Sequence, residues 1–221
     1  MTQFETELQD VKTELVNMWL LVILQLTKSR EALVKFDKDL AREVVLKEKR
    51  VNAYELKIDR DCENIFALYC PVAVDLRFLL AVLKINNNLE RIGDIAEGIS
   101  KYIVESPVKF DRELLESTQV LRMFDDSIDI LIDTQAAFEN DNTLLARTIF
   151  TRDEVLDEIN KNSDEIIAQY IKINLNKINQ ALYVSSIIRK LERVGDQSKN
   201  IAEEIIFFVE AKVLKHQKGA I

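Results

Sequence analysis

The chain of 221 residues is poor in the residues that interrupt helices, with only four glycines and two prolines. Glycine and proline are the strongest local markers of turns and loops, so few turns are expected. Because the chain is nearly half hydrophobic, at 48%, and also 31% charged, it has enough apolar residues for a folded core. These figures indicate long helices packed around a core.

Histidine is scarcer still, because His216 near the end of the chain is the single one. Without further histidines, no Ser-His-Asp or Cys-His catalytic set can be assembled. Ferritin-like di-iron bundles need Glu-x-x-His pairs on two helices, which argues strongly against that class. The chain also lacks a GxxxxGK[ST] phosphate loop and a GxGxxG motif. These absences predict that the protein is not an enzyme.

Cysteines and long apolar runs are few as well. Cys62 and Cys70 are eight residues apart, which favours a place in the core over a ligand or redox role. The start of the chain is polar and acidic, unlike a signal peptide, so a cytosolic protein with reduced thiols is expected.

No segment reaches the ~18–20 apolar residues of a membrane span. The strongest run, at 18–24, predicts a buried helix or an oligomer face, with Trp19 in the core or at a dimer interface.

The chain has no excess of positive charge. Its net charge is −8 and its pI is near 4.9. Binding to a nucleic-acid backbone needs a basic stripe, so no nucleic-acid partner is expected. An acidic balance fits solubility or a cationic ligand.

Apolar residues recur at helical spacing almost throughout the chain. Turn and helix-start signals divide it at 36–39, Pro71, 106–107 and 140–142. The predicted helices cover about 4–35, 39–69, 72–104, 111–138, 143–170 and 176–213. The tail at 215–221 is expected to fray.

The sequence repeats itself with a period close to half its length. The hexapeptide LERIGD at 89–94 returns as LERVGD at 191–196, which is 102 residues later. LAR at 40–42 likewise returns at 145–147, at an offset of 105. We therefore predict an all-α fold of two tandem three-helix bundles, with six long antiparallel helices related by internal duplication. The two bundles are predicted over 1–106 and 107–221.

Each copy of the hexapeptide carries two acidic residues four positions apart, with a glycine just before the second. Residues four apart share a helix face, so Glu90 lies beside Asp94 and Glu192 beside Asp196. Glycine costs a helix interior about 1 kcal/mol relative to alanine. Its presence in both copies indicates that a facing helix or a metal comes close at this point.

The preceding helix of each predicted bundle carries a matching polar pair. Asp153 and Asp157 share one face of the fifth predicted helix, and Glu48, Asn52 and Glu55 share one face of the second. If these faces meet the hexapeptide faces, carboxylates converge, and a bound cation would offset their repulsion. Oxygen ligands favour hard divalent or trivalent ions such as Mg²⁺, Mn²⁺, Ca²⁺ or iron. The second half, with four carboxylates, is the stronger candidate.

The acidic pairs also have a simpler interpretation. Arg91 and Arg193 precede the hexapeptide aspartates by three positions, which allows ordinary helical salt bridges worth about 0.2–0.5 kcal/mol. The acidic stripes would then be solvated faces of a metal-free scaffold that binds a basic partner helix. A third and weaker hypothesis is a hydrolase that acts through a metal-bound water.

The chain resembles the PhoU family, regulators of bacterial phosphate uptake. The resemblance rests on PVAVDLR at 71–77, LERIGDIA at 89–96 and the segment from Leu191 to Glu203, and it extends over nearly the whole chain. It implies two tandem three-helix bundles with multinuclear metal sites built from E/DxxxD motifs. The positions of this chain that match those motifs are Glu48, Asn52, Glu90, Asp94, Asp153, Asp157, Glu192 and Asp196.

The resemblance also implies a cytoplasmic homodimer that reaches the membrane only through its partners. Those partners would be the ATPase subunit of the phosphate ABC transporter and a phosphate-sensing histidine kinase. The protein would then be a negative regulator of phosphate uptake and of phosphate-starvation genes. A PhoU-like accessory to another anion transporter remains an alternative.

The chain departs from the family pattern at several positions. Ile95 and Gln197 stand where the family often has histidine. Asn52 replaces an aspartate, which would weaken metal binding in the first half. Lys199 stands where the first copy has Glu97, and its ammonium group would either repel a cation or point away.

Overall fold

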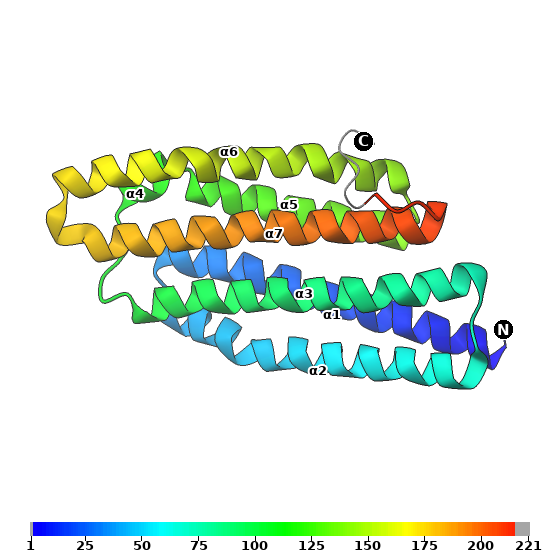
Figure 1. Cartoon of the computed structure of the whole chain (residues 1–221). Helices are drawn as coiled ribbons and strands as arrows, with labels where there is room; N and C mark the ends of the chain where they lie inside the picture. The colour runs from blue at the N-terminus through cyan, green and yellow to red at the C-terminus, as the bar shows by residue number, and fades with distance from the viewer. Residues whose placement is uncertain (1, 215–221) are drawn as a thin grey trace.

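The computed structural model describes residues 2–214, and within them the chain is helical throughout apart from short connections (Figure 1). The helices are, in chain order, α1 (Gln3–Lys35), α2 (Lys38–Tyr69), α3 (Ala73–Glu105), α4 (Arg112–Ser117), α5 (Val120–Glu139), α6 (Thr143–Ile173) and α7 (Ile178–Glu210), with the 3-10 turn η1 (Leu175–Lys177) before α7. Helices α1, α2 and α3 pack as one bundle, and α5, α6 and α7 pack as a second. The predicted all-α fold of two tandem bundles is confirmed. The expected fraying at 215–221 and the position of His216 lie outside the described residues.

Polar side chains cap the first turns of α2 and α6, at the positions where the sequence places its turn signals. The carboxylate of Asp37 accepts hydrogen bonds from the backbone N–H groups of Asp39 and Leu40, at 3.0 and 2.9 Å, and so caps α2. The side chain of Asn142 accepts from the N–H of Leu145 at 3.0 Å and caps α6. A side-chain oxygen at the N-cap satisfies backbone donors that the helix leaves free. These tight links make consecutive helices antiparallel, as Figure 1 shows.

The prediction of one helix over 111–138 is wrong, because the chain breaks between α4 and α5. Gln119 has a left-handed backbone with φ 55°, and the hydroxyl of Thr118 donates to the carbonyl of Leu114 at 2.7 Å. The apolar pattern continues across the break, with Leu114 and Val120 both fully buried. The apolar periodicity therefore gives no sign of the break between α4 and α5. The residue type gives none either, because left-handed backbone is uncommon for a residue other than glycine.

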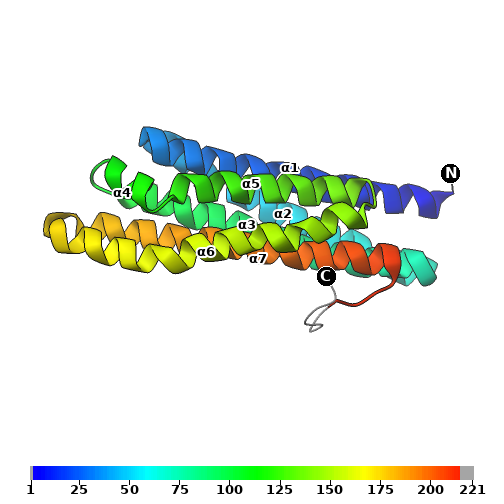
Figure 2. The same ribbon diagram turned by 90° about the horizontal axis from the view of Figure 1, so that it is seen from above.

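The two bundles lie side by side and share one core. Helices α3 and α7 run antiparallel along the middle of the molecule, and α5 lies along α1 (Figures 1 and 2). Trp19 of α1 is fully buried, and its indole N–H donates to the carbonyl of Leu131 in α5 at 3.1 Å. Trp19 is thus a core residue that joins the two halves, and not a dimer contact. The predicted boundary at 106/107 falls in the segment that connects α3 to α4.

The apolar residues singled out in the sequence take different places. Cys62 is buried as predicted, but the core place predicted for Cys70 is wrong, because α2 ends at Tyr69 and Cys70 is exposed in the following turn. In the run at 18–24 Leu20 is 53% exposed, so only part of it is buried. Among the described residues, no helix combines the length and the apolar character that crossing a membrane requires.

Candidate metal centre

The pairing of α2 with α3, and of α6 with α7, brings the predicted site residues together in two groups. The first carboxylate cluster consists of Glu48, Asn52, Glu55, Glu90 and Asp94. The second carboxylate cluster consists of Asp153, Asp157, Glu192 and Asp196. All eight predicted ligands therefore lie in one cluster or the other, with Glu55 added to the first. The i, i+4 spacing is what puts each pair on the face of its helix that meets the facing pair.

Electrostatic repulsion is strong in the first cluster. Burial, followed by the charges of Asp94, Glu55 and Glu48, raises the pKa of Glu90 to about 7. Burial, followed by the charge of Asp94, also raises the pKa of Glu48. In the part of the chain that the structure describes, no lysine or arginine forms an ion pair with any of the four carboxylates of this cluster. Its negative charge is therefore offset only in part, by the more distant charges of Lys101 on Glu48 and of Arg91 on Glu90.

Glu48 offers a free oxygen ligand in the first cluster. Its side chain lies almost entirely out of solvent, at 6% exposure. One carboxylate oxygen, Oε2, accepts a hydrogen bond from the amide of Asn52 at 2.8 Å. The other, Oε1, is buried with no hydrogen-bond partner. Buried polar atoms are almost always paired, so an unpaired buried oxygen of this kind could serve as a metal ligand.

A lysine occupies the corresponding place in the second cluster. The ammonium group of Lys199 donates to Oδ2 of Asp153 at 2.5 Å and to Oδ1 of Asp196 at 3.3 Å. Asp153 is 2% exposed, and burial raises its pKa, whereas the hydrogen bond from Lys199 opposes that rise. Burial would lower the pKa of Lys199, but the hydrogen bond and charge of Asp153 raise it overall. Lys199 thus points into the cluster, which counts against the preference for the second half drawn from its four carboxylates.

The two hexapeptide glycines allow the facing helices to approach closely, as their repetition indicated. A Cβ atom at Gly195 would overlap Oδ1 of Asp153 and lie 2.7 Å from Cδ1 of Leu156. A Cβ atom at Gly93 would lie 3.0 Å from Cγ1 of Val51, which is tight but involves no polar group at that distance. Gly195 is therefore needed to seat the buried Asp153, whereas Gly93 has more room.

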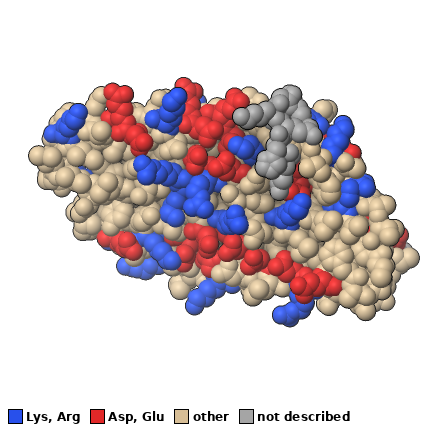
Figure 3. Space-filling model, viewed as in Figure 1, with Lys and Arg blue, Asp and Glu red and all other residues tan. Residues whose placement is uncertain are grey.

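The simple salt bridges suggested by the sequence are not the ones that form in the second half. Asp196 pairs across 3.3 Å with Lys199, three positions after it, and not with Arg193, three positions before it. Basic side chains gather instead between the bundles, where a hollow of about 330 Å³ is lined by Arg91, Lys101, Lys190 and Arg193 among others. Figure 3 shows this arrangement on one face of the molecule, with basic side chains along the middle and acidic side chains on either side.

Two buried polar residues beside the first cluster were missed by the sequence-based prediction. Gln25 of α1 is 1% exposed, and neither polar atom of its amide has a hydrogen-bond partner. Its Oε1 lies 3.5 Å from the point where Gly93 would carry a Cβ. Asn86 of α3 donates to the carbonyl of Glu55 at 3.0 Å and to Asp59 at 2.9 Å. The signal available in the sequence was a single amide residue within the apolar stripe of each helix.

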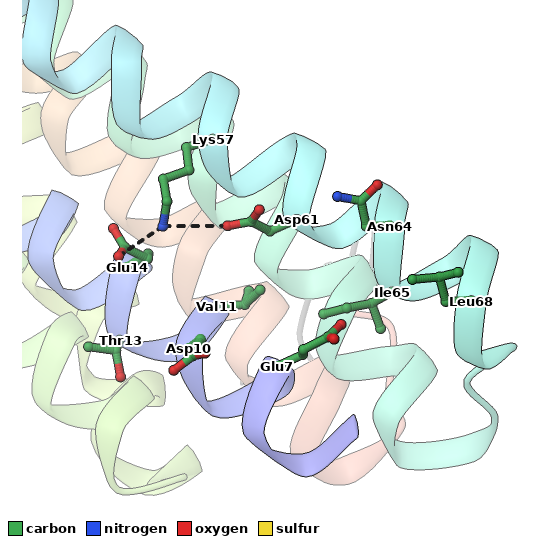
Figure 4. Close-up of a pocket in the computed structure, with 10 residues that line it drawn as sticks. All are labelled: Glu7, Asp10, Val11, Thr13, Glu14, Lys57, Asp61, Asn64, Ile65 and Leu68. Carbon is green, nitrogen blue, oxygen red and sulfur yellow. Dashed lines mark ion pairs between the residues drawn. The ribbon is translucent and has the colours of Figure 1, made fainter. Parts of the chain in front are cut away.

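A separate acidic pocket lies between the start of α1 and the end of α2 (Figure 4). It measures about 730 Å³. Its acidic residues include Glu14 and Asp61, and the ammonium group of Lys57 lies between these two at 2.9 and 3.5 Å. None of the predicted ligands lines this pocket, and its internal lysine compensates part of its charge.

Within the described residues, no three Asp, Glu, His or Cys side chains are grouped in a way that could hold a metal ion as they stand. The donors of the first cluster are nevertheless carboxylate and amide oxygens, which suit a hard cation. The unpaired, buried Oε1 of Glu48 fits such an ion, and in the second cluster Oδ1 of Asp153 is also buried without a hydrogen-bond partner.

A family model of the PhoU domain matches the chain twice, over residues 15–103 and 120–205. The chain belongs to the PhoU family. Each PhoU match covers one bundle and contains one carboxylate cluster. The resemblance seen in the sequence motifs is confirmed.

Known PhoU proteins match almost the whole chain. It is 32% identical over 217 residues to the phosphate-specific transport system accessory protein PhoU of Edwardsiella tarda, covering 98% of this chain and 88% of that protein. It is 31% identical over 215 residues to PhoU homolog 1 of Thermotoga maritima, covering 96% and 91%. The crystal structure of PhoU from Pseudomonas aeruginosa superposes with a TM-score of 0.86 at 29% identity, over 95% of this chain and all of that one.

Replacing the two PhoU-motif glycines should have unequal effects. Alanine is favoured over glycine in a helix by about 1 kcal/mol, which offsets mild crowding. We expect Gly93→Ala to change the free energy of unfolding by less than about 1 kcal/mol. Gly195→Ala should lower it by about 1–3 kcal/mol, because the methyl group displaces Asp153 and Leu156. Urea unfolding measures both, and equal effects would contradict the close approach at Gly195.

The raised pKa of Glu90 predicts a pH dependence of stability in metal-free protein. A glutamate whose pKa is about 7 when folded, against 4.5 when exposed, binds its proton more tightly in the folded state. The free energy of unfolding should therefore fall as the pH rises from about 4.5 to about 7. Glu90→Gln, which stays neutral, should reduce this fall.

The measurement is urea unfolding with chelator at pH 5 and pH 8. The control is Glu63→Gln, which changes an exposed carboxylate on α2. The pH dependence is expected to shrink in Glu90→Gln and to stay at the wild-type value in the control. An unchanged pH dependence in Glu90→Gln would show that this carboxylate does not carry the effect.

Proposed function

We propose that this protein is a metal-binding negative regulator of phosphate uptake and of phosphate-starvation signalling. Its support is the full-length similarity to proteins described as accessories of the phosphate-specific transport system. A structure described as the phosphate transport system regulatory protein PhoU from Streptococcus pneumoniae also superposes, with a TM-score of 0.85 at 27% identity over 96% of this chain. This is a binding and signalling role, and no catalytic step is assigned.

The proposed partners are the ATPase subunit of the phosphate ABC transporter and a phosphate-sensing histidine kinase. Both would be met at the cytoplasmic side of the membrane, where the protein acts as a homodimer. These assignments rest on family membership, because relatives are named for the transport system that they serve. An accessory role for a different anion transporter is the alternative within the same family.

The proposed metal lies between α2 and α3. Glu48, Glu90 and Asp94 would hold it, with Glu55 and Asn52 beside them. The observation that carries this assignment is the unpaired, buried Oε1 of Glu48, in a cluster whose carboxylates form no ion pair with a lysine or arginine among the described residues. Oxygen ligands of this type suit Mg²⁺, Mn²⁺, Ca²⁺ or iron. A bound cation would neutralise the cluster and fasten α2 to α3.

A metal-free scaffold is the second candidate. It is favoured by the spread of the carboxylates, which leaves no ready-made set of three ligands among the described residues. In that case chelator would leave both the melting temperature and partner binding unchanged.

The metal assignment predicts which carboxylates retain a cation. Wild-type protein loaded with Mn²⁺ and desalted should keep metal at a fixed ratio to protein, measured by elemental analysis. Glu90→Gln/Asp94→Asn should lose at least about 90% of it, because two charged ligands become neutral. Glu14→Gln, which alters the separate acidic pocket, should keep it. No metal above background in the wild type would refute metal binding.

The regulatory assignment predicts a phenotype in the source organism. Deleting the gene should raise phosphate uptake and alkaline phosphatase expression in phosphate-rich medium, because a negative regulator is lost. A plasmid copy of the wild-type gene should reverse both changes. Unchanged uptake and expression after the deletion would count against this role and favour another transporter.

A further inference from the structure

We propose that Lys199 takes the place of a metal ion in the second carboxylate cluster, so that this protein binds metal in its first bundle only. The part that concerns the first bundle rests on the proposed function. The part that concerns Lys199 stands on the geometry of α6 and α7, and it departs from the two metal sites that the family pattern implies.

The ammonium group of Lys199 bridges the same two helices that a metal would bridge. It donates to Oδ2 of Asp153 on α6 and to Oδ1 of Asp196 on α7. Lys199 stands three positions after Asp196, one turn along the same helix face, so its side chain reaches the cluster without any change in the backbone. The positive charge is therefore supplied by the chain itself.

Asp153 is already paired with a cation that belongs to the chain. Its Oδ2 accepts the hydrogen bond from Lys199. Its Oδ1 has no hydrogen-bond partner and lies so close to Gly195 that a Cβ atom there would overlap it. At 2% exposure the carboxylate needs a compensating charge beside it. The ammonium group supplies that charge, and a divalent ion placed beside it would be repelled. We expect this repulsion to weaken metal binding by at least about 100-fold.

The first cluster has the opposite charge at the corresponding position. The duplication places Glu97 where the second half has Lys199. Glu97 pairs with Lys101 at 2.7 Å, one turn further along α3 and not with the cluster. Glu48 corresponds to Asp153, and each has one buried oxygen without a hydrogen-bond partner. The other oxygen of Glu48 accepts from the neutral amide of Asn52, whereas that of Asp153 accepts from the ammonium group of Lys199. The change from Glu97 in the first half to Lys199 in the second is thus the difference between a cluster that can accept a cation and one that already contains an ammonium group.

This difference gives the two bundles different dependence on metal. The contact between α6 and α7 is neutralised at any metal concentration, because its cation is covalently part of the chain. The carboxylates between α2 and α3 form no ion pair with a lysine or arginine among the described residues, so their charge is neutralised in full only when a cation binds. Changes in metal supply would therefore act on the first bundle alone.

The test uses two double variants, Glu192→Gln/Asp196→Asn and Glu90→Gln/Asp94→Asn, and adds Lys199→Gln to the second of them. Full-length protein is loaded with Mn²⁺ and desalted, and bound Mn²⁺ is counted by elemental analysis and by electron paramagnetic resonance. Glu192→Gln/Asp196→Asn should keep the wild-type metal content. Adding Lys199→Gln to Glu90→Gln/Asp94→Asn should restore bound Mn²⁺, now in the second cluster, whereas the exposed Lys161→Gln should restore none.

Thermal unfolding gives a second readout. With chelator, Lys199→Gln should lower the melting temperature by about 5 °C, because Asp153 loses its counter-charge. Mn²⁺ should restore it in Lys199→Gln and in Lys199→Gln combined with Glu90→Gln/Asp94→Asn. Lys199→Arg, which keeps the charge and the fold, should gain no metal.

The outcomes separate the two proposals. Loss of metal in Glu192→Gln/Asp196→Asn, or no gain of metal on removal of Lys199, would overturn the role of Lys199. A wild type without metal would refute the proposed metal in the first bundle. A gain of Mn²⁺ in Lys199→Gln would in that case still support Lys199 as the built-in cation.

Discussion

Negative charge buried between two packed helices has to be compensated by a proton, an ammonium group or a metal ion. Both bundles of this protein meet that constraint where the duplicated hexapeptide faces the preceding helix. In the second bundle Lys199 supplies the charge to the almost fully buried Asp153. In the first bundle Glu90, with a pKa of about 7, is poised to hold a proton when no cation is bound. The arrangement of α2 against α3, and of α6 against α7, depends on how this charge is neutralised.

The rest of the fold holds these carboxylates in place. Three long helices in each bundle fix the register of the facing pairs, and the contact of α3 with α7 joins the bundles. Trp19 ties α1 to α5 through a buried hydrogen bond, so the two halves form one body. Metal bound in the first bundle would therefore be felt along α3, which also forms the contact with the second bundle. Helix α3 would in this way connect the binding of a metal ion to the contact between the two bundles.

Much of this could be predicted from the sequence, because helical periodicity, capping residues and an internal repeat are local signals. The position of the acidic pairs followed from i, i+4 spacing and from the match between the two halves. The break at Gln119 could not be predicted, since apolar residues continue through it in helical register. The direction of Lys199 could not be predicted either, because a long flexible amine can reach solvent or a carboxylate equally well from one backbone position. Gln25 was missed because it comes from a third helix, α1.

The central claim is that the two related clusters are neutralised by different cations. Anomalous diffraction from crystals grown with Mn²⁺ tests it most directly, because the signal locates the metal without assumptions about its ligands. The account predicts a peak between α2 and α3, beside Glu48, Glu90 and Asp94, and none between α6 and α7, where the ammonium group of Lys199 lies. A peak between Asp153 and Asp196, with the lysine turned away, would contradict it.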